Sequence, residues 1–211
     1  MISGSGGAAN KLGPDSPTTK SRPVRVTRSY LSMASAELLT PGAPPVKAAT
    51  LVLLEACPVP TWRALYAQIG GEWHWHDRDA WPDAKLEAHL ASPDVRIYRA
   101  DASLGEARDA KGMLVDKPLI GVGFVELERH TDGSVEISYL GLDRRAFDLG
   151  LGRWIVAEAT KESWAMGATK VWLHSCTLDG PAALSNYLAR GFTRDRVEEY
   201  DTVIHESLGA D

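Results

Sequence analysis

The sequence predicts an α/β (α+β) protein, and three observations carry this prediction. Short apolar runs, alternating or continuous as in strands, recur along the chain. Runs with helical spacing separate them, and glycine or proline marks many of the boundaries. The turn sequence Thr131-Asp132-Gly133 joins two strand candidates and indicates a hairpin.

Composition limits the class of protein. With 211 residues, 44% of them hydrophobic, the chain is long enough for one domain with a full core. The net charge of -5 argues against general nucleic-acid binding. No apolar run reaches the length of a membrane span and no hydrophobic signal core is present, so we expect a cytoplasmic protein without a membrane partner. Cys57 and Cys176 have no metal-binding spacing, and we expect free thiols.

The order of elements follows from local signals. Residues 1–23 are rich in Gly, Ser, Pro, Thr and Lys, so we expect a disordered tail before a single domain over 24–211; a targeting peptide is the alternative. The strand candidates are 24–33, 46–55, 95–100, 119–128, 135–142, 170–176 and 192–204, the last one as a hairpin or strand pair. The helix candidates are 61–69, a segment from Pro82 to about 90, 151–166 and 181–189.

Capping residues and glycines support these bounds. Thr61 is suited to cap the first helix, and Gly70-Gly71 ends it. Pro181 suits the first turn of the last helix, which Gly191 closes. The polar stretch 101–117 is expected to be a loop-like hairpin connection.

The functional argument starts from the loop before the third helix candidate. The strand candidate that ends at Leu142 leads through a polar turn into Leu149-Gly150-Leu151-Gly152. Such a loop leaves main-chain N–H groups unpaired at the positive end of a helix dipole, which suits a phosphate or pyrophosphate. The glycines let the ligand approach the backbone. A dinucleotide-binding fold is disfavoured because four or more strand candidates precede the glycines.

Three pieces of the chain, in order and spacing, resemble the GNAT superfamily of acyl-CoA-dependent N-acyltransferases. Val135–Leu142 is similar to the family's splayed fourth strand, Leu149–Arg153 to its pyrophosphate loop, and Ala182–Phe192 to its terminal "A…Y…GF" signature. The resemblance covers about 118–206. It implies a mixed, mostly antiparallel sheet of about seven strands flanked by helices, with the fourth and fifth strands splayed. It also implies direct transfer of an acetyl group from acetyl-CoA to a primary amine of a small molecule, without a metal.

The same resemblance implies how acetyl-CoA is held. Main-chain groups of Leu140 and Leu142 would pair with the pantetheine arm, and an N–H near Leu140 would polarise the thioester carbonyl. The cofactor-binding residues that it implies are Leu140, Gly141, Leu142, Asp148, Leu149, Gly150, Leu151, Gly152, Arg153, Asp179 and Ala182. Because Asp148 places an acid near the diphosphate, it should weaken binding unless it points away or is paired by Arg144, Arg145 or Arg153.

Two residues are implied as catalytic. Glu136 is similar in position to the general base of some family members; the alternative is that it faces solvent, as we expect for Glu126 and Glu128. Tyr187 is similar in position to the family's general acid, because a phenol stays protonated at neutral pH. The alternative for Tyr187 is a packing aromatic beside Phe192.

A segment dense in aromatic and ionisable groups follows the first helix candidate. With one residue of strand candidate 170–176, it is expected to line the acceptor site through Trp73, His74, Trp75, Asp77, Arg78 and His174. Arg78 is expected to clamp a carboxylate, and His74 or His76 is a second candidate for the base. For each residue alone, packing in the core is the alternative. Two histidines two positions apart are weak support for a metal, which we reject.

Two other functions stay open on the sequence. One is a non-catalytic acyl-CoA-binding sensor or interaction module, and the other is a protein or peptide N-acetyltransferase. The aromatic-rich segment favours a small-molecule acceptor. A homodimer through the last strands is compatible with the sequence, although nothing requires it.

Overall fold

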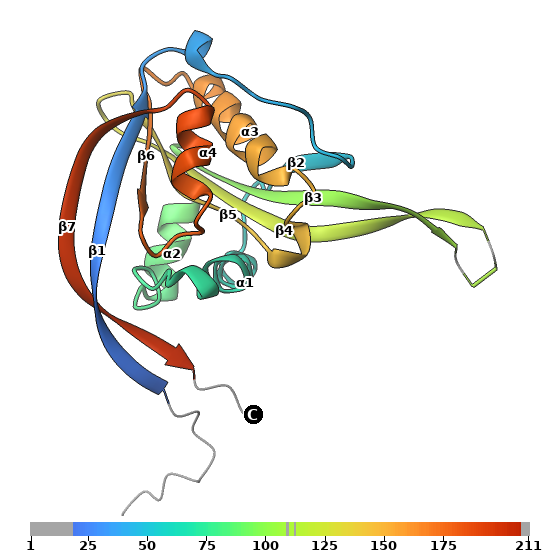
Figure 1. Ribbon diagram of the computed structural model, residues 1–211, viewed down its shortest axis with the longest axis horizontal. Helices are drawn as coiled ribbons and strands as arrows, with labels where there is room; N and C mark the ends of the chain where they lie inside the picture. The colour runs from blue at the N-terminus through green and yellow to red at the C-terminus, as the bar shows by residue number, and fades with distance from the viewer. Residues whose placement is uncertain (1–18, 109, 112, 208–211) are drawn as a thin grey trace, which may run out of the picture. The chain divides into compact units, whose positions relative to one another are not determined.

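The computed structural model describes residues 19–108, 110–111 and 113–207 (Figure 1). The strands within them are β1 (Thr19–Met33), β2 (Ala49–Leu53), β3 (Val95–Arg108), β4 (Leu114–Arg129), β5 (Val135–Leu142), β6 (Val171–Cys176) and β7 (Thr193–Ser207). The α-helices are α1 (Val59–Gly70), α2 (Asp83–Leu90), α3 (Leu151–Ala165) and α4 (Ala183–Ala189). Short 3₁₀ turns are η1 (Ala36–Leu38), η2 (Gly71–Trp73) and η3 (Arg144–Ala146).

Contacts divide the chain into two units. One holds the terminal segments, up to Arg25 and from Asp201 on. Within it, Arg25 and Asp201 form an exposed ion pair at 3.4 Å, a kind of contact that contributes little to stability. The other unit, Val26–Tyr200, contains all the α-helices given above and every residue of the site described below.

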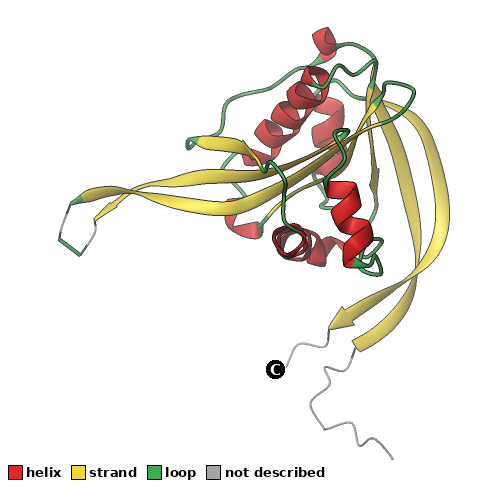
Figure 2. Ribbon diagram, turned by 180° about the vertical axis from the view of Figure 1, so that it is seen from behind, coloured by secondary structure: helices red, strands yellow, loops and turns green. Residues whose placement is uncertain are grey.

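The strands form one mixed sheet in the order β2-β3-β4-β5-β6-β1-β7. The pairs β2–β3, β3–β4, β4–β5 and β1–β6 are antiparallel, whereas β5 and β6 pair in parallel. Helices α3 and α4 lie on one side of the sheet and α1 and α2 on the other (Figures 1 and 2). The predicted seven-stranded, mostly antiparallel sheet flanked by helices is confirmed.

Each side of the sheet has its own apolar core. Helix α3 buries Leu151, Ile155, Val156 and Ala159, the spacing of one helical face, and packs on the strands from one side. The core on the other side is built largely from aromatic and large aliphatic side chains, including Trp62, Tyr66, Ile69, Leu86, Phe124 and Tyr139. The sheet therefore separates two environments, an aliphatic one under α3 and an aromatic one under α1.

The two ends of the chain differ from the prediction. A hairpin within 192–204 was wrong: β7 runs unbroken from Thr193 to Ser207, because that stretch contains no glycine or proline to reverse it. Its neighbour in the sheet is β1, at the other end of the sequence. Strand β1 already begins at Thr19, so the tail boundary at residue 23 was too late, and residues 1–18 lie outside the described part.

The stretch 101–117 is mostly strand instead of loop. Strand β3 continues to Arg108 and β4 starts at Leu114, with register shifts between Ala100 and Ala102 and between Ser103 and Glu106. This part of the hairpin extends beyond the helices (Figures 1 and 2). A strand that no helix covers has no apolar face to maintain, which explains why its sequence looked like a loop.

Helix bounds agree closely with the sequence, with two exceptions. Helix α4 starts at Ala183, so Pro181 precedes the helix and does not stand in its first turn. Helix α1 starts at Val59 after Pro58, two residues before the expected cap at Thr61. Proline fits the start of a helix because its missing N–H would have no helical partner there. Gly70 and Gly71 stand at its end as predicted.

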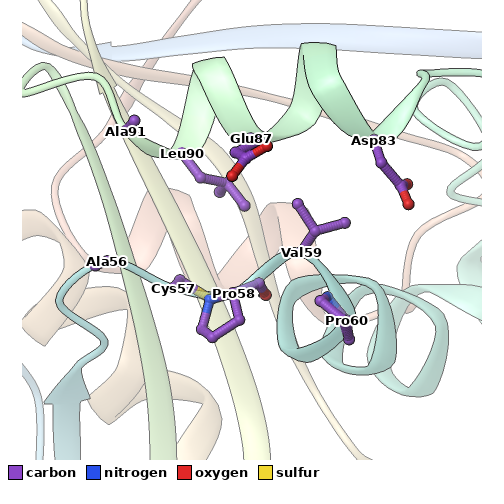
Figure 3. Close-up of a pocket in the computed structure, with 9 residues that line it drawn as sticks. All are labelled: Ala56, Cys57, Pro58, Val59, Pro60, Asp83, Glu87, Leu90 and Ala91. Atoms are coloured by element: carbon purple, nitrogen blue, oxygen red, sulfur yellow. Dashed lines mark hydrogen bonds between the residues drawn. The ribbon is translucent and has the colours of Figure 1, made fainter.

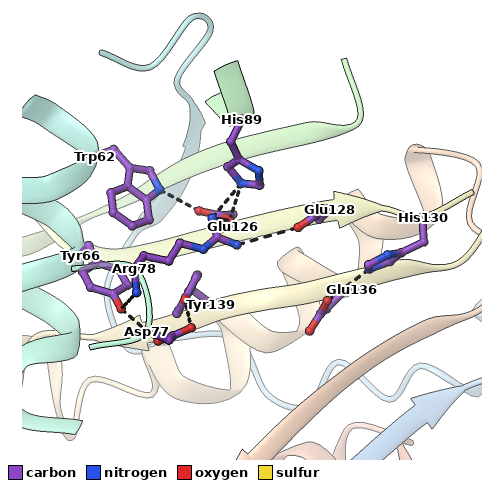
Figure 4. A network of polar contacts seen from close by, with 10 residues as sticks. All are labelled: Trp62, Tyr66, Asp77, Arg78, His89, Glu126, Glu128, His130, Glu136 and Tyr139. Atoms are coloured by element: carbon purple, nitrogen blue, oxygen red, sulfur yellow. Dashed lines mark hydrogen bonds and ion pairs between the residues drawn. The ribbon is translucent and has the colours of Figure 1, made fainter. Parts of the chain in front are cut away.

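Glu126 on β4 is a charged residue inside the aromatic core. The expectation that it faces solvent was wrong, since its side chain is fully buried. It accepts a hydrogen bond from Trp62 Nε1 at 2.7 Å and pairs with the Arg78 guanidinium at 2.6 Å, and His89 Nε2 lies 3.0 Å away (Figure 4). Burial alone would lower the pKa of Arg78, but the charges around it, with that of Glu126 foremost, outweigh burial and raise it.

Removing Glu126 should destabilise the protein strongly. Glu126→Ala leaves the Arg78 guanidinium buried without its main partner, which costs about 3–5 kcal/mol. Urea denaturation measures this loss. The double variant Arg78→Met, Glu126→Leu should recover part of it, since no buried guanidinium then remains without a carboxylate, although Trp62 Nε1 still lacks its acceptor. As a control, Glu158→Ala removes only a surface pair with Lys161, worth about 0–1 kcal/mol. A loss for Glu126→Ala as small as that of the control would contradict the importance of the buried pair.

Candidate active site

Strands β5 and β6 part after two residue pairs. Their parallel pairing consists of Val135 with Val171 and Glu136 with Trp172. Strand β5 stays paired with β4 as far as Leu142, but a register shift leaves Ser138 as an extra residue. This is a β-bulge, which bends the strand that contains it. The bend turns the rest of β5 away from β6 and opens a gap between two neighbouring strands, so the expected splay is present.

The bulge also decides which main-chain groups face the gap. Asp143 N donates to Val122 O at 2.8 Å, so at Asp143 the N–H points to β4. Main-chain groups alternate in direction along an antiparallel strand. Those of Leu142 and Leu140 therefore point to the opposite edge, where the described residues of β6 no longer pair with β5. Their N–H and C=O groups are available to a ligand that lies along this edge.

The glycine loop connects η3 with α3. Asp148 and Gly150 both have positive φ, +62° and +73°, immediately before the helix begins at Leu151. At Gly150 this conformation favours glycine, because a Cβ would be strained there. The first-turn amides of α3 have no acceptor within the helix and form an anion site with the helix dipole. A Cβ on Gly152 would meet only Asn186 Nδ2, at 3.8 Å, among the described atoms around it.

The connection between β1 and β2 crosses this loop. Val46 N donates to Leu149 O at 3.0 Å, and Arg153 Nε donates to Ala43 O at 2.8 Å. The Cα of Pro45 lies 3.5 Å from the place that a Cβ on Gly150 would take. These contacts engage the Leu149 carbonyl of the loop. They do not involve the first-turn N–H groups of α3, which can therefore donate hydrogen bonds to an anion. Residues 43–46 therefore form one wall of the anion site, which the sequence did not indicate.

Asp148 is exposed and is not held by the arginines around it. Those arginines have other partners, which are Glu72 for Arg144, Asp143 for Arg145 and the main chain of Ala43 for Arg153. Of the two conditions under which Asp148 would not weaken binding of a diphosphate, pairing with one of these arginines is therefore not seen among the described residues, which leaves a side chain that points away.

Glu136 lies beside two imidazoles at the point where the strands part. Its Oε2 is 3.2 Å from His130 Nε2, and its Oε1 is 3.7 Å from His174 Nδ1. Only 15% of its side chain is exposed, so the solvent-facing alternative is not favoured. The His130 ring lies 5.5 Å from the ring of Trp172. These contacts gather a carboxylate, two imidazoles and an indole around the opening of the gap.

Tyr187 on α4 is buried and packs edge-on against Phe192 with ring centroids 6.3 Å apart. Burial first, and then the charge of Asp179, raise the pKa of Tyr187 above its ordinary value. The phenol is therefore protonated at neutral pH, as a proton donor must be. Asn186 of the same helix donates to Gly152 O at 2.8 Å, which holds α4 against the first turn of α3. The structure thus shows Tyr187 packed against Phe192, as the alternative interpretation expected. This packing is compatible with a hydroxyl that donates a proton.

Asp179 and Ala182 lie in the turn between β6 and α4. Asp179 Oδ2 accepts hydrogen bonds from the Ser175 hydroxyl at 2.7 Å and from Cys176 N–H at 2.8 Å. Its carboxylate therefore fixes the end of β6. Ala182 is the N-cap residue of α4.

Trp73 and Trp75 touch the two sides of the gap. The Trp75 ring lies 3.2 Å from the place of a Cβ on Gly141 of β5 and 5.0 Å from the ring of Tyr139. The Trp73 ring lies 3.4 Å from the place of a Cβ on Gly180, in the turn after β6. The aromatic segment thus contacts both separated strands, as a wall of an acceptor site requires.

The remaining residues of that segment have structural partners. Asp77 accepts hydrogen bonds from Tyr66 and Tyr139, and Arg78 is held by Glu126 (Figure 4). With its charge balanced inside the core, Arg78 is not placed to clamp a carboxylate. His76 Nδ1 is bound to Asp79 at 2.8 Å, and the His74 ring lies 6.3 Å from that of His76, so the structure does not bring either histidine to Glu136.

A cluster of His89, Glu126 and Glu128 has the donor atoms and spacing of a metal site, within 4.8 Å of one another. The Arg78 guanidinium lies 2.6 Å from Glu126 and 3.8 Å from Glu128. A cation is therefore already present among these carboxylates, which explains their closeness without a metal.

A pocket of about 530 Å³ lies between the start of α1 and α2 (Figure 3). It is lined by Ala56, Cys57, Pro58, Val59, Pro60, Asp83, Glu87, Leu90 and Ala91. None of these is a predicted site residue. Burial raises the pKa of Cys57 to about 11, so its thiol is protonated at neutral pH and is a poor nucleophile.

Sequence reasoning missed two neighbours of the gap. His130 follows β4 directly, and the hairpin turn brings it back to Glu136; the predicted turn at 131–133 was a signal that could have placed it. Tyr30 of β1 lies with its ring 6.0 Å from that of His174. Nothing in the sequence indicates that contact, since it depends on β1 pairing with β6.

These features define a class of protein, an α/β protein with a parted pair of parallel strands beside a glycine loop at a helix N-terminus. No family model and no curated protein sequence matches the chain. Solved structures do match. A GCN5-related N-acetyltransferase from Kribbella flavida has a TM-score of 0.55 at 18% identity, over 89% of this chain and 61% of that one. One from Sphaerobacter thermophilus has a TM-score of 0.55 at 15% identity, over 90% and 55%.

The protein has the fold of the GCN5-related N-acetyltransferases, as the sequence predicted. It spans about three fifths of the length of the Kribbella flavida protein. The match therefore establishes the fold, and the activity of that whole protein can only be proposed for this chain. Among the described residues, no helix is both long and apolar enough to cross a membrane.

The turn before the glycine loop should weaken in acid. Asp143 caps η3 through the N–H of Arg145, and hydrogen bonding by Arg145 lowers the pKa of Asp143 to about 2. The charged form therefore stabilises the folded state, fully above the unfolded pKa of about 3.9, and this contribution is lost as the pH falls toward 2. Asp143→Ala should cost about 1 kcal/mol at pH 7. Urea denaturation at pH 7 and pH 3 should show a smaller difference at pH 3, and an equal difference at both would contradict the assignment.

Proposed function

We propose that this protein is an N-acyltransferase that moves an acetyl group from acetyl-CoA to a primary amine of a small molecule by direct transfer. The observation that carries the proposal is the parting of β5 from β6 beside the glycine loop, with main-chain groups of Leu140 and Leu142 facing the gap. The acetyltransferases that share the fold support it.

The site fits acetyl-CoA in its chemistry. The first-turn amides of α3, at Leu151, Gly152 and Arg153, would hold the diphosphate, where no Cβ at Gly152 obstructs the approach. The free edge of β5 would pair with the amide groups of the pantetheine arm. When bound, the cofactor supplies an acyl group activated as a thioester, and the N–H of Leu140 would polarise its carbonyl.

Transfer to a primary ammonium removes two protons from its nitrogen and delivers one proton to the leaving sulfur. The cluster around Glu136 would take a proton from the amine, whose free electron pair then forms the bond to the acyl carbon. As the carbon–sulfur bond breaks, Tyr187 would give its phenolic proton to the sulfur and regain one from solvent. The second proton of the nitrogen leaves to solvent. Direct transfer needs no nucleophile from the protein, in agreement with a protonated Cys57.

Trp73, Trp75 and His174 would contact the acceptor, because they lie around the gap. Asp77 and Arg78 would support the wall from behind, since both are bound inside the core. Recognition of a carboxylate on the acceptor therefore has no support from Arg78, and we favour a simple amine with an apolar body that the indoles can cover.

A panel of amino acids, polyamines, aminoglycosides and peptides, assayed with acetyl-CoA for thiol release corrected for hydrolysis, tests the proposal. Amine-dependent release with a small molecule supports it. Release with peptides alone would favour a protein acceptor. Tight binding of acetyl-CoA without turnover on any amine would favour a sensor.

The anion site has a test that leaves the fold intact. Gly152→Ala should fit the free protein, since its Cβ would meet only Asn186 at an ordinary 3.8 Å, but should hinder approach of the diphosphate. We expect an affinity for coenzyme A at least tenfold lower by calorimetry. Gly71→Ala is the matched control, because a Cβ there meets nothing within 4 Å and the residue lies outside the loop. Equal affinity in both variants would rule out this placement of the diphosphate.

The proton donor has a separate test. Tyr187→Phe should lower kcat by about 10² or more with little change in affinity for coenzyme A, because only the hydroxyl is removed. Tyr98→Phe serves as the control, since it removes a buried hydroxyl bound to Glu162, away from the gap. Unchanged kcat in Tyr187→Phe would leave Tyr187 with its packing role alone.

A further inference from the structure

Both oxygens of the Glu136 carboxylate have an imidazole nitrogen nearby, and one of the two is within hydrogen-bond distance. Oε2 faces His130 Nε2 at 3.2 Å, and Oε1 faces His174 Nδ1 at 3.7 Å. With 15% of its side chain exposed, it has little surface left for an amine to reach. Of the two groups that face each other across the opening, His174 is the more accessible, at 37%.

The position of His174 in β6 places it at the opening of the gap. Trp172 is the residue paired with Glu136, the last pair between β5 and β6. His174 is two residues further on, so it points to the same face of the sheet as Trp172. It is the first residue of that face beyond the point at which the strands part. An amine that approaches a thioester in the gap therefore passes His174.

We infer that Nε2 of His174 is the atom that takes the proton from the acceptor amine, and that Glu136 is a positioning residue that acts through it; this rests on the proposed function. Because Nδ1 is the ring nitrogen that lies 3.7 Å from the carboxylate, we assign the proton of the neutral ring to Nδ1, which leaves the electron pair on Nε2 free. A carboxylate behind one ring nitrogen fixes the tautomer and the orientation of the ring.

The proton balance is simple. An N–H bond of the ammonium substrate breaks, its electron pair stays on the amine nitrogen, and an N–H bond forms at Nε2. The positive charge that develops on the ring is faced by Glu136, whose cross-strand neighbour on β4 is a second carboxylate, Glu128. Because His174 is partly exposed, its proton can then leave to solvent.

The other groups around His174 do not replace it in this role. His130 is nearer to Glu136 and about equally exposed, at 36%, but it lies in the turn after β4 with Trp172 beside it and not on a strand that borders the gap. Tyr30 of β1 lies 6.0 Å from the His174 ring, and Arg196 lies 3.9 Å from the centre of the Tyr30 ring, where it adds positive charge beyond the tyrosine. Glu136 is therefore the charged group of the described residues that faces Nδ1 most directly.

The tautomer can be measured without any substrate. In ¹⁵N spectra of the protein at pH 8, His174 should be in the Nδ1–H form, and Glu136→Gln should shift it toward the Nε2–H form that free histidine favours. Assignment comes from the signal lost in His174→Gln. An Nε2–H form in the wild-type protein, or no change in Glu136→Gln, would overturn the positioning role.

Kinetics test the proton transfer itself. With an amine that the wild type acetylates, the pH dependence of kcat/KM should change when His174 is replaced by glutamine. His174→Gln should lose about 10² or more in kcat, and His174→Gly should be partly rescued by added imidazole. His76→Gln is the control, since His76 is bound to Asp79 on the surface.

The outcomes separate the two proposals. A wild-type rate and pH profile in His174→Gln would overturn the inference while leaving acyl transfer established. A wild type that binds no coenzyme A and acetylates no amine would contradict the proposed function, and the proton-accepting role with it. The tautomer measurement stands by itself in either case.

Discussion

The structure depends on a strand that loses its partner inside a sheet. Main-chain N–H and C=O groups that are buried without a partner are costly, so interior strands normally pair on both edges. Strand β5 does so only as far as Glu136, and the bulge at Ser138 then leads it away from β6. The Ser138 hydroxyl is itself buried without a hydrogen bond in the described residues. The unpaired edge of β5, inside the sheet, can therefore form main-chain hydrogen bonds with an extended ligand.

The two faces of the sheet supply different chemistry to this opening. The face under α3 and α4 provides the helix N-terminus and Tyr187, with Asn186 holding the two helices together at Gly152. The face under α1 and α2 provides the Glu136 cluster and the two tryptophans. The buried pair of Arg78 and Glu126 lies behind them and fixes the segment between α1 and α2 to β4. In the proposed function, groups that would handle a cofactor and groups that would handle an acceptor thus meet where the strands part.

What the sequence allowed us to predict was local. The glycine loop, the hairpin at 131–133 and the bounds of α2 and α3 each depend on a short run of residues, and the structure has them where expected. The sequence did not allow us to predict contacts between residues that are far apart along the chain. Whether Glu126 faces water or Arg78 depends on a contact between residues in different elements, and the wall at 43–46 depends on a connection that passes over the loop. A local pattern has no information on either.

The place of β1 in the sheet has a consequence for how the protein forms. Thr27 and Thr177, 150 positions apart, are joined by a hydrogen bond, because β1 lies beside β6. On the ribosome β1 is synthesised well before β6. Closing so long a loop is slow compared with forming a hairpin. The nascent β1 segment therefore waits without its neighbour in the sheet.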